Sequence, residues 1–214
     1  MTLRDLPEIY LDNGIPAVRD WTPGLLAGLL KTYEREVSSR GFSPREYLKP
    51  GLSEDAVRFQ LKRIDMEPPS ELITWFGWAN GSSVHFPGIW PAALDQAVDR
   101  YIQVDLETYD DPEPGLEEFD WGAGRGWLRL ALDNYTKAID CRPGHTEPVE
   151  IHQTDPSFGF DNEVYGRCRS LSTLVTWWIE GLRAGAHEWS ASARAWVTAD
   201  FSAIPVLQKE SGLA

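Results

Sequence analysis

The spacing of the apolar residues changes along this chain of 214 residues, and this change constrains the fold more than any other feature. Up to about residue 102 apolar residues recur every three or four positions, as they do on one face of a helix. Short strand-like runs follow, and a strong helical pattern comes after them. Helices, then consecutive strands, then a helix predict an α+β fold, in which helices pack against a largely antiparallel or mixed sheet.

Capping residues and apolar stripes predict five helices. Their expected starts are Thr22, Ser53, Pro68, Pro91 and Ser170. The first should end before Gly41, the third at Asn80-Gly81 and the fifth at Gly185, because Gly and Asn adopt the left-handed conformation that stops a helix. The apolar face of the fifth helix includes Leu174 and Trp178, so both are predicted to be core residues.

Four strands are predicted between the fourth and fifth helices. They cover 127–131, 137–141, 148–152 and 164–168 and are separated by turn-forming residues. The last thirty or so residues, with Trp189, Trp196 and Phe201, are expected to be irregular chain or a short helix fixed by aromatic contacts. In each of the pairs Trp75/Trp78 and Trp177/Trp178 we expect one ring in the core and the other near the surface.

Negative charge is concentrated in one stretch of the chain. The formal net charge is -13, and the segment from Gln103 to Asp120 has eight acidic residues and no basic one. These residues are Asp105, Glu107, Asp110, Asp111, Glu113, Glu117, Glu118 and Asp120. Such a stretch is either a solvated loop or a docking surface for a basic partner. Trp121 follows it directly and is either an apolar anchor for that partner or a core residue at the start of a strand.

The search for catalytic and cofactor motifs finds no recognisable pattern. The glycines of 122–126 match neither a dinucleotide-binding motif nor a P-loop, and a turn explains them better. Cys141, His145, His152 and Cys168 do not have the spacing of zinc ligands, and the two cysteines are interpreted as core thiols. We therefore expect no enzymatic activity, no metal and no cofactor.

Composition also bears on location and partners. Two cysteines form no disulfide framework, the N-terminus lacks a signal-peptide core, and no apolar run is long enough for a membrane span. A cytoplasmic protein is the expectation. Direct binding to nucleic acid or to an anionic membrane is not expected, since both require basic surfaces.

Five segments resemble, in order and spacing, the motifs of the SUKH superfamily, the Smi/Knr-like proteins. Residues 68–81 (PPSELITWFGWANG) resemble its signature helix with a terminal Asn-Gly, and GWLRL at 126–130 resembles its W-L-P-L/I strand. AIDCRPG at 138–144 resembles its L-x-x-D-x-x-P-G strand and turn, PVEI at 148–151 the next strand, and SLSTLVTWW at 170–178 its closing helix. Two departures are 133–136 (DNYT), where the family has a glycine-rich turn, and Arg169, where it has a small residue.

The resemblance implies a SUKH-like α+β domain over 53–185, with an N-terminal helical extension at 1–52 and a C-terminal extension at 186–214. Bacterial members of the superfamily commonly act as immunity proteins that bind and neutralise polymorphic toxins, often nucleases or deaminases. Fungal members are regulators of cell-wall assembly with many partners. Nuclease toxins are basic because they bind the phosphates of nucleic acid, so an acidic inhibitor would be complementary to them in charge.

These observations predict a non-enzymatic protein-binding domain, an immunity protein whose partner is a basic toxin domain. An intracellular regulatory scaffold of the Smi/Knr type is the alternative. A carbohydrate-active or carbohydrate-binding protein is a third possibility, which a cleft lined by two carboxylates and stacked Trp rings would favour.

Overall fold

The computed structural model describes residues 6–102, 126–131, 136–154 and 164–213 of the chain. Six strands form one sheet: β1 (Ile9–Asp12), β2 (Ile15–Val18), β8 (Val164–Arg169), β7 (Glu150–Thr154), β6 (Thr136–Asp140) and β5 (Trp127–Arg129), in this spatial order. Neighbouring strands are antiparallel, except that β2 and β8 run parallel. The prediction of an α+β fold with a largely antiparallel or mixed sheet is confirmed.

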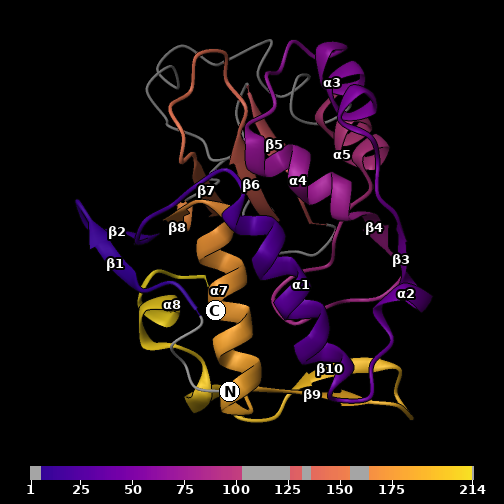
Figure 1. The fold of residues 1–214 in the computed structure, drawn as a ribbon, viewed down its shortest axis with the longest axis vertical. Helices are drawn as coiled ribbons and strands as arrows, with labels where there is room; N and C mark the ends of the chain where they lie inside the picture. Colours follow the sequence, from indigo (N-terminus) through magenta and orange to yellow (C-terminus); the bar gives the residue numbers. More distant parts are fainter. Residues whose placement is uncertain (1–5, 103–125, 132–135, 155–163, 214) are drawn as a thin grey trace.

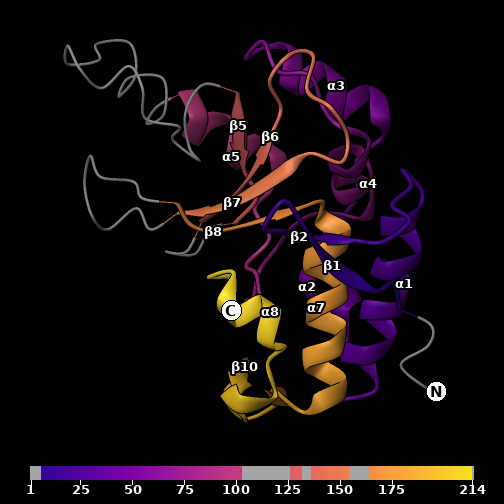
Figure 2. The same ribbon diagram turned by 90° about the vertical axis from the view of Figure 1, so that its left-hand side faces the viewer.

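Helices α1 (Leu25–Ser38) and α7 (Leu171–Ala184) pack side by side through the middle of the molecule (Figure 1). The other elements of the N-terminal half are α2 (Pro44–Tyr47), β3 (Leu48–Pro50), α3 (Glu54–Lys62), α4 (Ser70–Trp78), β4 (Ala79–Ser82) and α5 (Leu94–Arg100). After α7 come β9 (His187–Ser190), β10 (Ala195–Thr198), the 3-10 helix η4 (Phe201–Ala203) and α8 (Val206–Glu210). Figure 2 shows the sheet at the N-terminal end of α7, with α8 and β10 beside and below its C-terminal half.

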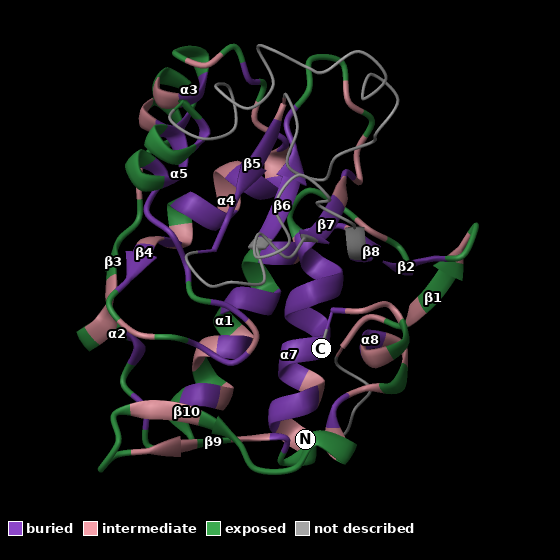
Figure 3. Cartoon of the chain, turned by 180° about the vertical axis from the view of Figure 1, so that it is seen from behind, coloured by how far each residue is buried: buried purple, intermediate pink, exposed green. Residues whose placement is uncertain are grey.

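Helix α7 begins and ends where its sequence predicts. The Ser170 side chain accepts a hydrogen bond from the backbone N–H of Thr173, and Gly185 is the left-handed C-cap with a φ of +84°. Leu174 and Trp178 are both buried, as predicted. Helix α7 is buried around nearly its whole circumference (Figure 3), since α1, strands of the sheet and β9 all contact it.

Three predicted helix starts are too early, one of them by only two residues, since α4 begins at Ser70 rather than Pro68. Helix α1 begins at Leu25 rather than Thr22, because the N–H of Leu25 donates to the carbonyl of Thr22 at 3.0 Å and closes a turn first. Helix α5 begins at Leu94 rather than Pro91, because the N–H of Ala92 donates to the carbonyl of Leu130 at 2.9 Å, beside the sheet.

The Asn80-Gly81 pair does not end the third helix. Helix α4 stops at Trp78, and Ala79 is extended with a φ of -154°. The next residues form β4, which pairs with β3. The Asn80 side chain instead accepts the N–H of Leu94 at 2.8 Å, so this asparagine caps the following helix, α5.

The segment 1–52, expected to be a helical extension, also supplies strands β1 and β2 to the central sheet. Ile15, Ala17 and Val18 are buried, and the N–H of Val18 donates to the Thr173 hydroxyl on α7 at 3.1 Å. Leu29, Leu30 and Tyr33 of α1 belong to the same hydrophobic core as α7. The N-terminal segment and the region 53–185 therefore share one core.

The chain after α7 is more regular than predicted. Strands β9 and β10 form an antiparallel hairpin in which Trp189 is paired with Trp196. Both indoles contact Phe42, with ring centroids 4.6 and 5.5 Å away. Aromatic contacts fix this segment, as expected, but they do so on a hairpin.

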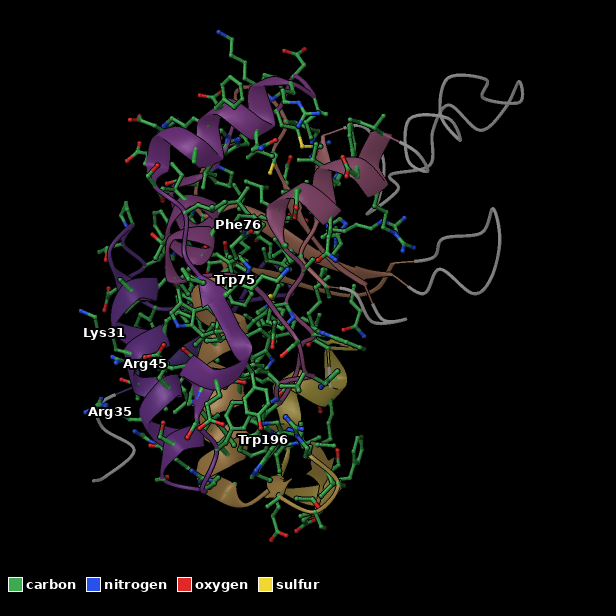
Figure 4. The ribbon with its side chains drawn as sticks, turned by 90° about the vertical axis from the view of Figure 1, so that its right-hand side faces the viewer. Lys31, Arg35, Arg45, Trp75, Phe76 and Trp196 are labelled. Carbon is green, nitrogen blue, oxygen red and sulfur yellow. The ribbon has the colours of Figure 1, made fainter. Side chains whose placement is uncertain are left out.

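The tryptophan pairs behave differently from each other. Trp75 is buried and Trp78 is half-buried, as predicted for the first pair. Trp177 and Trp178 are both buried, each 1% exposed, so the prediction for the second pair is wrong. The reason is the central position of α7, which has neighbours on both sides. Figure 4 shows Trp75 and Phe76 in the upper part of the molecule and Trp196 in the lower part.

Candidate binding site on the sheet face

All nine residues predicted to contact a partner lie outside the described residues: Asp105, Glu107, Asp110, Asp111, Glu113, Glu117, Glu118, Asp120 and Trp121. The described residues that flank them are close together. The N–H of Gly126 donates to the Tyr101 hydroxyl at 3.2 Å, and Tyr101 is buried. The two ends of the described chain on either side of residues 103–125 therefore lie close together, between the end of α5 and the start of β5.

Gly126 is required at this place. Its φ is +85°, and a Cβ atom there would lie 2.3 Å from Cγ of Arg142. The carbonyl of Gly126 accepts the N–H of Cys141 at 2.7 Å. Gly126, the first described residue after the acidic segment, is thus closely packed against the turn that follows β6.

The sheet has one apolar face and one polar face beside this junction. Leu128, Ile139, Ile151 and Cys168 are opposite one another on β5, β6, β7 and β8 and belong to the hydrophobic core. Side chains alternate along a strand, so the neighbouring residues project from the other face. These neighbours form two rows across the strands, one of Trp127, Asp140, Glu150 and Arg169 and one of Arg129, Ala138, His152 and Arg167.

Ion pairs organise this polar face. Arg142 makes a two-point contact with Asp140, with nitrogen–oxygen distances of 3.0 and 2.8 Å. This contact lowers the pKa of Asp140, because the hydrogen bonds and the charge of Arg142 outweigh the effect of burial. Arg169 on β8 pairs with Asp12 on β1, which joins the N-terminal hairpin to the rest of the sheet.

An aromatic stack lies beside these pairs. The rings of Trp127 and His152 are stacked with centroids 4.1 Å apart and an interplanar angle of 27°. The Arg142 guanidinium lies over the Trp127 ring at 5.4 Å from its centroid. Nε2 of His152 is 2.9 Å from a carboxylate oxygen of Glu150, two residues earlier on the same strand.

A pocket with a volume of about 410 Å³ opens among these side chains, and we call it the sheet-face pocket. It is lined by Trp127, Asp140, Glu150, His152 and Arg169 of the strands and by residues 142 and 146–149 of the β6–β7 connection. Glu147 links the pocket to α4, because its carboxylate accepts hydrogen bonds from the backbone N–H and the hydroxyl of Ser70. The pocket is next to Gly126, at which the described chain resumes after residue 102.

The arrangement of the described residues gives little support to zinc binding, thiol chemistry or sugar binding. His152 and Cys168 lie on opposite faces of the sheet, which separates two of the four residues examined as zinc ligands. Within the described ranges, no three His, Cys, Asp or Glu residues are grouped to bind a metal ion. Burial raises the pKa of the Cys141 and Cys168 thiols, which disfavours the reactive thiolate. Trp127 is 2% exposed, so its ring offers no free face to a sugar.

A basic surface lies on another side of the molecule. Lys31 and Arg35 on α1 and Arg45 on α2 are exposed along one edge (Figure 4), and none of the three has an ion pair among the described residues. A shallow hollow beside Arg45 is also lined by Glu34 and Glu46, so its charges are mixed. This surface is a weaker candidate than the sheet-face pocket.

The sequence analysis did not predict the sheet-face pocket, although several of its residues lie in segments that were described there. Trp127, Asp140 and Glu150 lie in three of the segments that resemble SUKH motifs. Their alternation with Leu128, Ile139 and Ile151 was a signal that they share the polar face. The alternation along each strand does not give the register between strands, and it is the register that places these residues in one row.

A search of protein-family models and a search of curated proteins each found no match to this chain. The resemblance to the SUKH superfamily therefore depends on the motif residues alone. No helix in the described part of the chain has the length and apolar character needed to cross a membrane.

Proposed function

We propose that this chain is a non-enzymatic, SUKH-type protein-binding domain, a cytoplasmic immunity protein that neutralises a basic toxin domain of the nuclease or deaminase type. The observation that carries the proposal is the acidic segment, with eight carboxylates and no basic residue between Gln103 and Asp120. Like charges gathered in this way repel one another, so they contribute little to folding, and a basic partner would relieve the repulsion.

The attachment of the segment supports a docking role. The described residues before and after it contact each other, since the N–H of Gly126 donates to the hydroxyl of Tyr101, and Tyr101 belongs to the hydrophobic core. The eight carboxylates belong to one short segment of the sequence, between two described residues that contact each other. A concentrated negative field accelerates association with a positive partner and disfavours acidic ones.

Co-expression with a candidate toxin domain encoded beside the gene, followed by affinity capture and an assay of toxin activity, tests the proposal. We expect a stoichiometric complex in which the toxin is inactive. Changing Asp110, Asp111, Glu117 and Glu118 to Asn or Gln should slow association and flatten its salt dependence, with a smaller effect on dissociation.

The matched control neutralises four exposed acidic residues elsewhere, Glu46, Asp55, Glu188 and Glu210, and so changes the net charge equally. Association rates that fall equally in both quadruple variants would show that net charge, and not the acidic segment, attracts the partner. Failure to capture any toxin domain would contradict the immunity function.

A further inference from the structure

The sheet-face pocket has negative charge that its own arginines do not balance. Asp140 is paired with Arg142, and Arg169 is paired with Asp12. Within the described part of the chain, Glu147 and Glu150 have no ion pair with a lysine or an arginine. Glu147 accepts hydrogen bonds from Ser70, and Glu150 is hydrogen bonded to His152. Two carboxylates of the lining are therefore available to a cationic ligand.

His152, which also lines the sheet-face pocket, has a ring nitrogen without a hydrogen-bond partner among the described residues. The residue is 4% exposed, and its Nδ1 is buried without a hydrogen-bond partner among the described residues. A neutral ring that donates from Nε2 to Glu150 has its lone pair on Nδ1, which is then an acceptor. A buried acceptor without a donor costs free energy, and a ligand with N–H groups would supply that donor.

These two observations define the ligand by its chemistry. It is positively charged, it has several N–H donors, and it is small enough for a hollow of about 410 Å³. A guanidinium group is planar and has five N–H donors, so it can contact more than one acceptor at once. We infer that the sheet-face pocket binds an arginine side chain of the basic protein partner, with Glu147, Glu150 and His152 as acceptors.

This inference rests on the proposed function and adds a defined contact to it. The pocket includes Trp127, which is seven residues after Asp120, the last acidic residue of the segment. Concentrated carboxylates attract a basic partner over a distance, whereas a partly buried pocket slows its dissociation. Arginine is also among the residues that most often dominate binding energy at protein interfaces. The acidic segment and the pocket would therefore contact the same partner in succession.

Binding of Nα-acetyl-arginine amide to the full-length protein tests the pocket without a toxin. The imidazole resonances of His152, assigned with a His152→Gln variant, are followed by NMR during titration. We expect a saturable shift with the arginine probe and no saturable shift with Nα-acetyl-citrulline amide, which has nearly the same shape but no charge. Glu150→Gln should weaken binding by about fivefold or more, as expected for loss of a charge-assisted hydrogen bond.

The control variant is Glu188→Gln, an exposed glutamate on β9 that should leave the affinity unchanged. Thermal unfolding of each variant verifies that it is folded. Equal shifts with arginine and citrulline, equal weakening by Glu150→Gln and Glu188→Gln, or no saturation with either probe would each overturn the inference. Probe binding without toxin capture would contradict the proposed partner but not the pocket, and toxin capture without probe binding would contradict the pocket but not the partner.

Discussion

At the scale of single residues, the buried carboxylate of Glu71 has a clear structural task. It is 1% exposed on α4 and accepts the backbone N–H groups of Leu171 and Ser172 at 2.8 and 2.9 Å. The Ser172 hydroxyl donates to it as well. Helix α7 has no acidic residue in its own first turn, so a residue of another helix supplies the negative charge at its N-terminus.

Replacing Glu71 with alanine should destabilise the fold by roughly 2–4 kcal/mol, because buried N–H groups at the start of α7 would lose their acceptor. Equilibrium unfolding in urea measures the effect. Glu188→Ala, at an exposed position, should change the free energy of unfolding little. Equal stability of the two variants would show that α7 does not depend on this cap.

Glu71 should also make stability depend on pH. Burial raises its pKa in the folded protein, against the opposing effect of its hydrogen bonds from Ser172 and Leu171. The folded state therefore retains a proton that the unfolded state has released. This retained proton adds to the free energy of unfolding. The added stability is fully present below the pKa of Glu71 in the unfolded state and is lost as the pH rises through its pKa in the folded state. The free energy of unfolding of Glu71→Gln, measured from acidic to neutral pH, should not show this loss.

Trp178 is the second residue whose role follows from burial. It is 1% exposed and contacts the rings of Tyr33 and Trp75, with centroids 5.9 and 6.3 Å away. Trp178→Ala should cost roughly 3–5 kcal/mol, the usual range for a large aromatic residue in a core. Phe59→Ala, where the ring is 69% exposed, is the control and should be nearly neutral in chemical denaturation. Wild-type stability of Trp178→Ala would contradict the packing of α7.

At the scale of elements, the N-terminal hairpin tests whether 1–52 folds with the rest of the chain. Strand β2 pairs with β8, and Asp12 of β1 is ion paired with Arg169 of β8. Both contacts join segments that are more than 150 residues apart in the sequence. Such contacts indicate one cooperative unit, not an appended segment.

Ile15 and Leu11 provide a matched pair in this hairpin, since Ile15 is 5% exposed and Leu11 is 54% exposed. We expect Ile15→Ala to lower the free energy of the main unfolding transition by roughly 2–4 kcal/mol and Leu11→Ala to change it by less than about 0.5 kcal/mol. If Ile15→Ala produced a separate early transition and left the main one unchanged, the hairpin would be an independent unit.

At the scale of the whole molecule, the acidic segment should be neutral or unfavourable for folding. Changing Asp110, Asp111, Glu117 and Glu118 to Asn or Gln removes four like charges from one short segment. Stability should stay the same or rise slightly, and any rise should shrink at high salt as screening weakens the repulsion. Thermal unfolding at low and high ionic strength measures this. A clear loss of stability would show that the carboxylates have structural partners.

The order of elements was readable from the sequence because its signals are local. Apolar periodicity and caps such as Ser170 and Gly185 act within one or two turns, so they predicted α7 and the four strands of 127–168 closely. Short strands such as β1 and β2 leave a weak periodic signal and depend on pairing with β8, so they were missed. Asn80 was misassigned because its hydrogen-bond partner is Leu94, on the next helix.

By itself, then, the sequence determined the class of fold, the position of the central helix and the concentration of acidic charge. Tertiary structure decided which helix surfaces are buried, as Trp177 and Trp178 show, because the elements that contact α7 leave nearly all of it buried. It also decided the polar site. Trp127, Asp140, Glu150 and Arg169 come from four strands, and strand register, set by long-range hydrogen bonds, places them in one row.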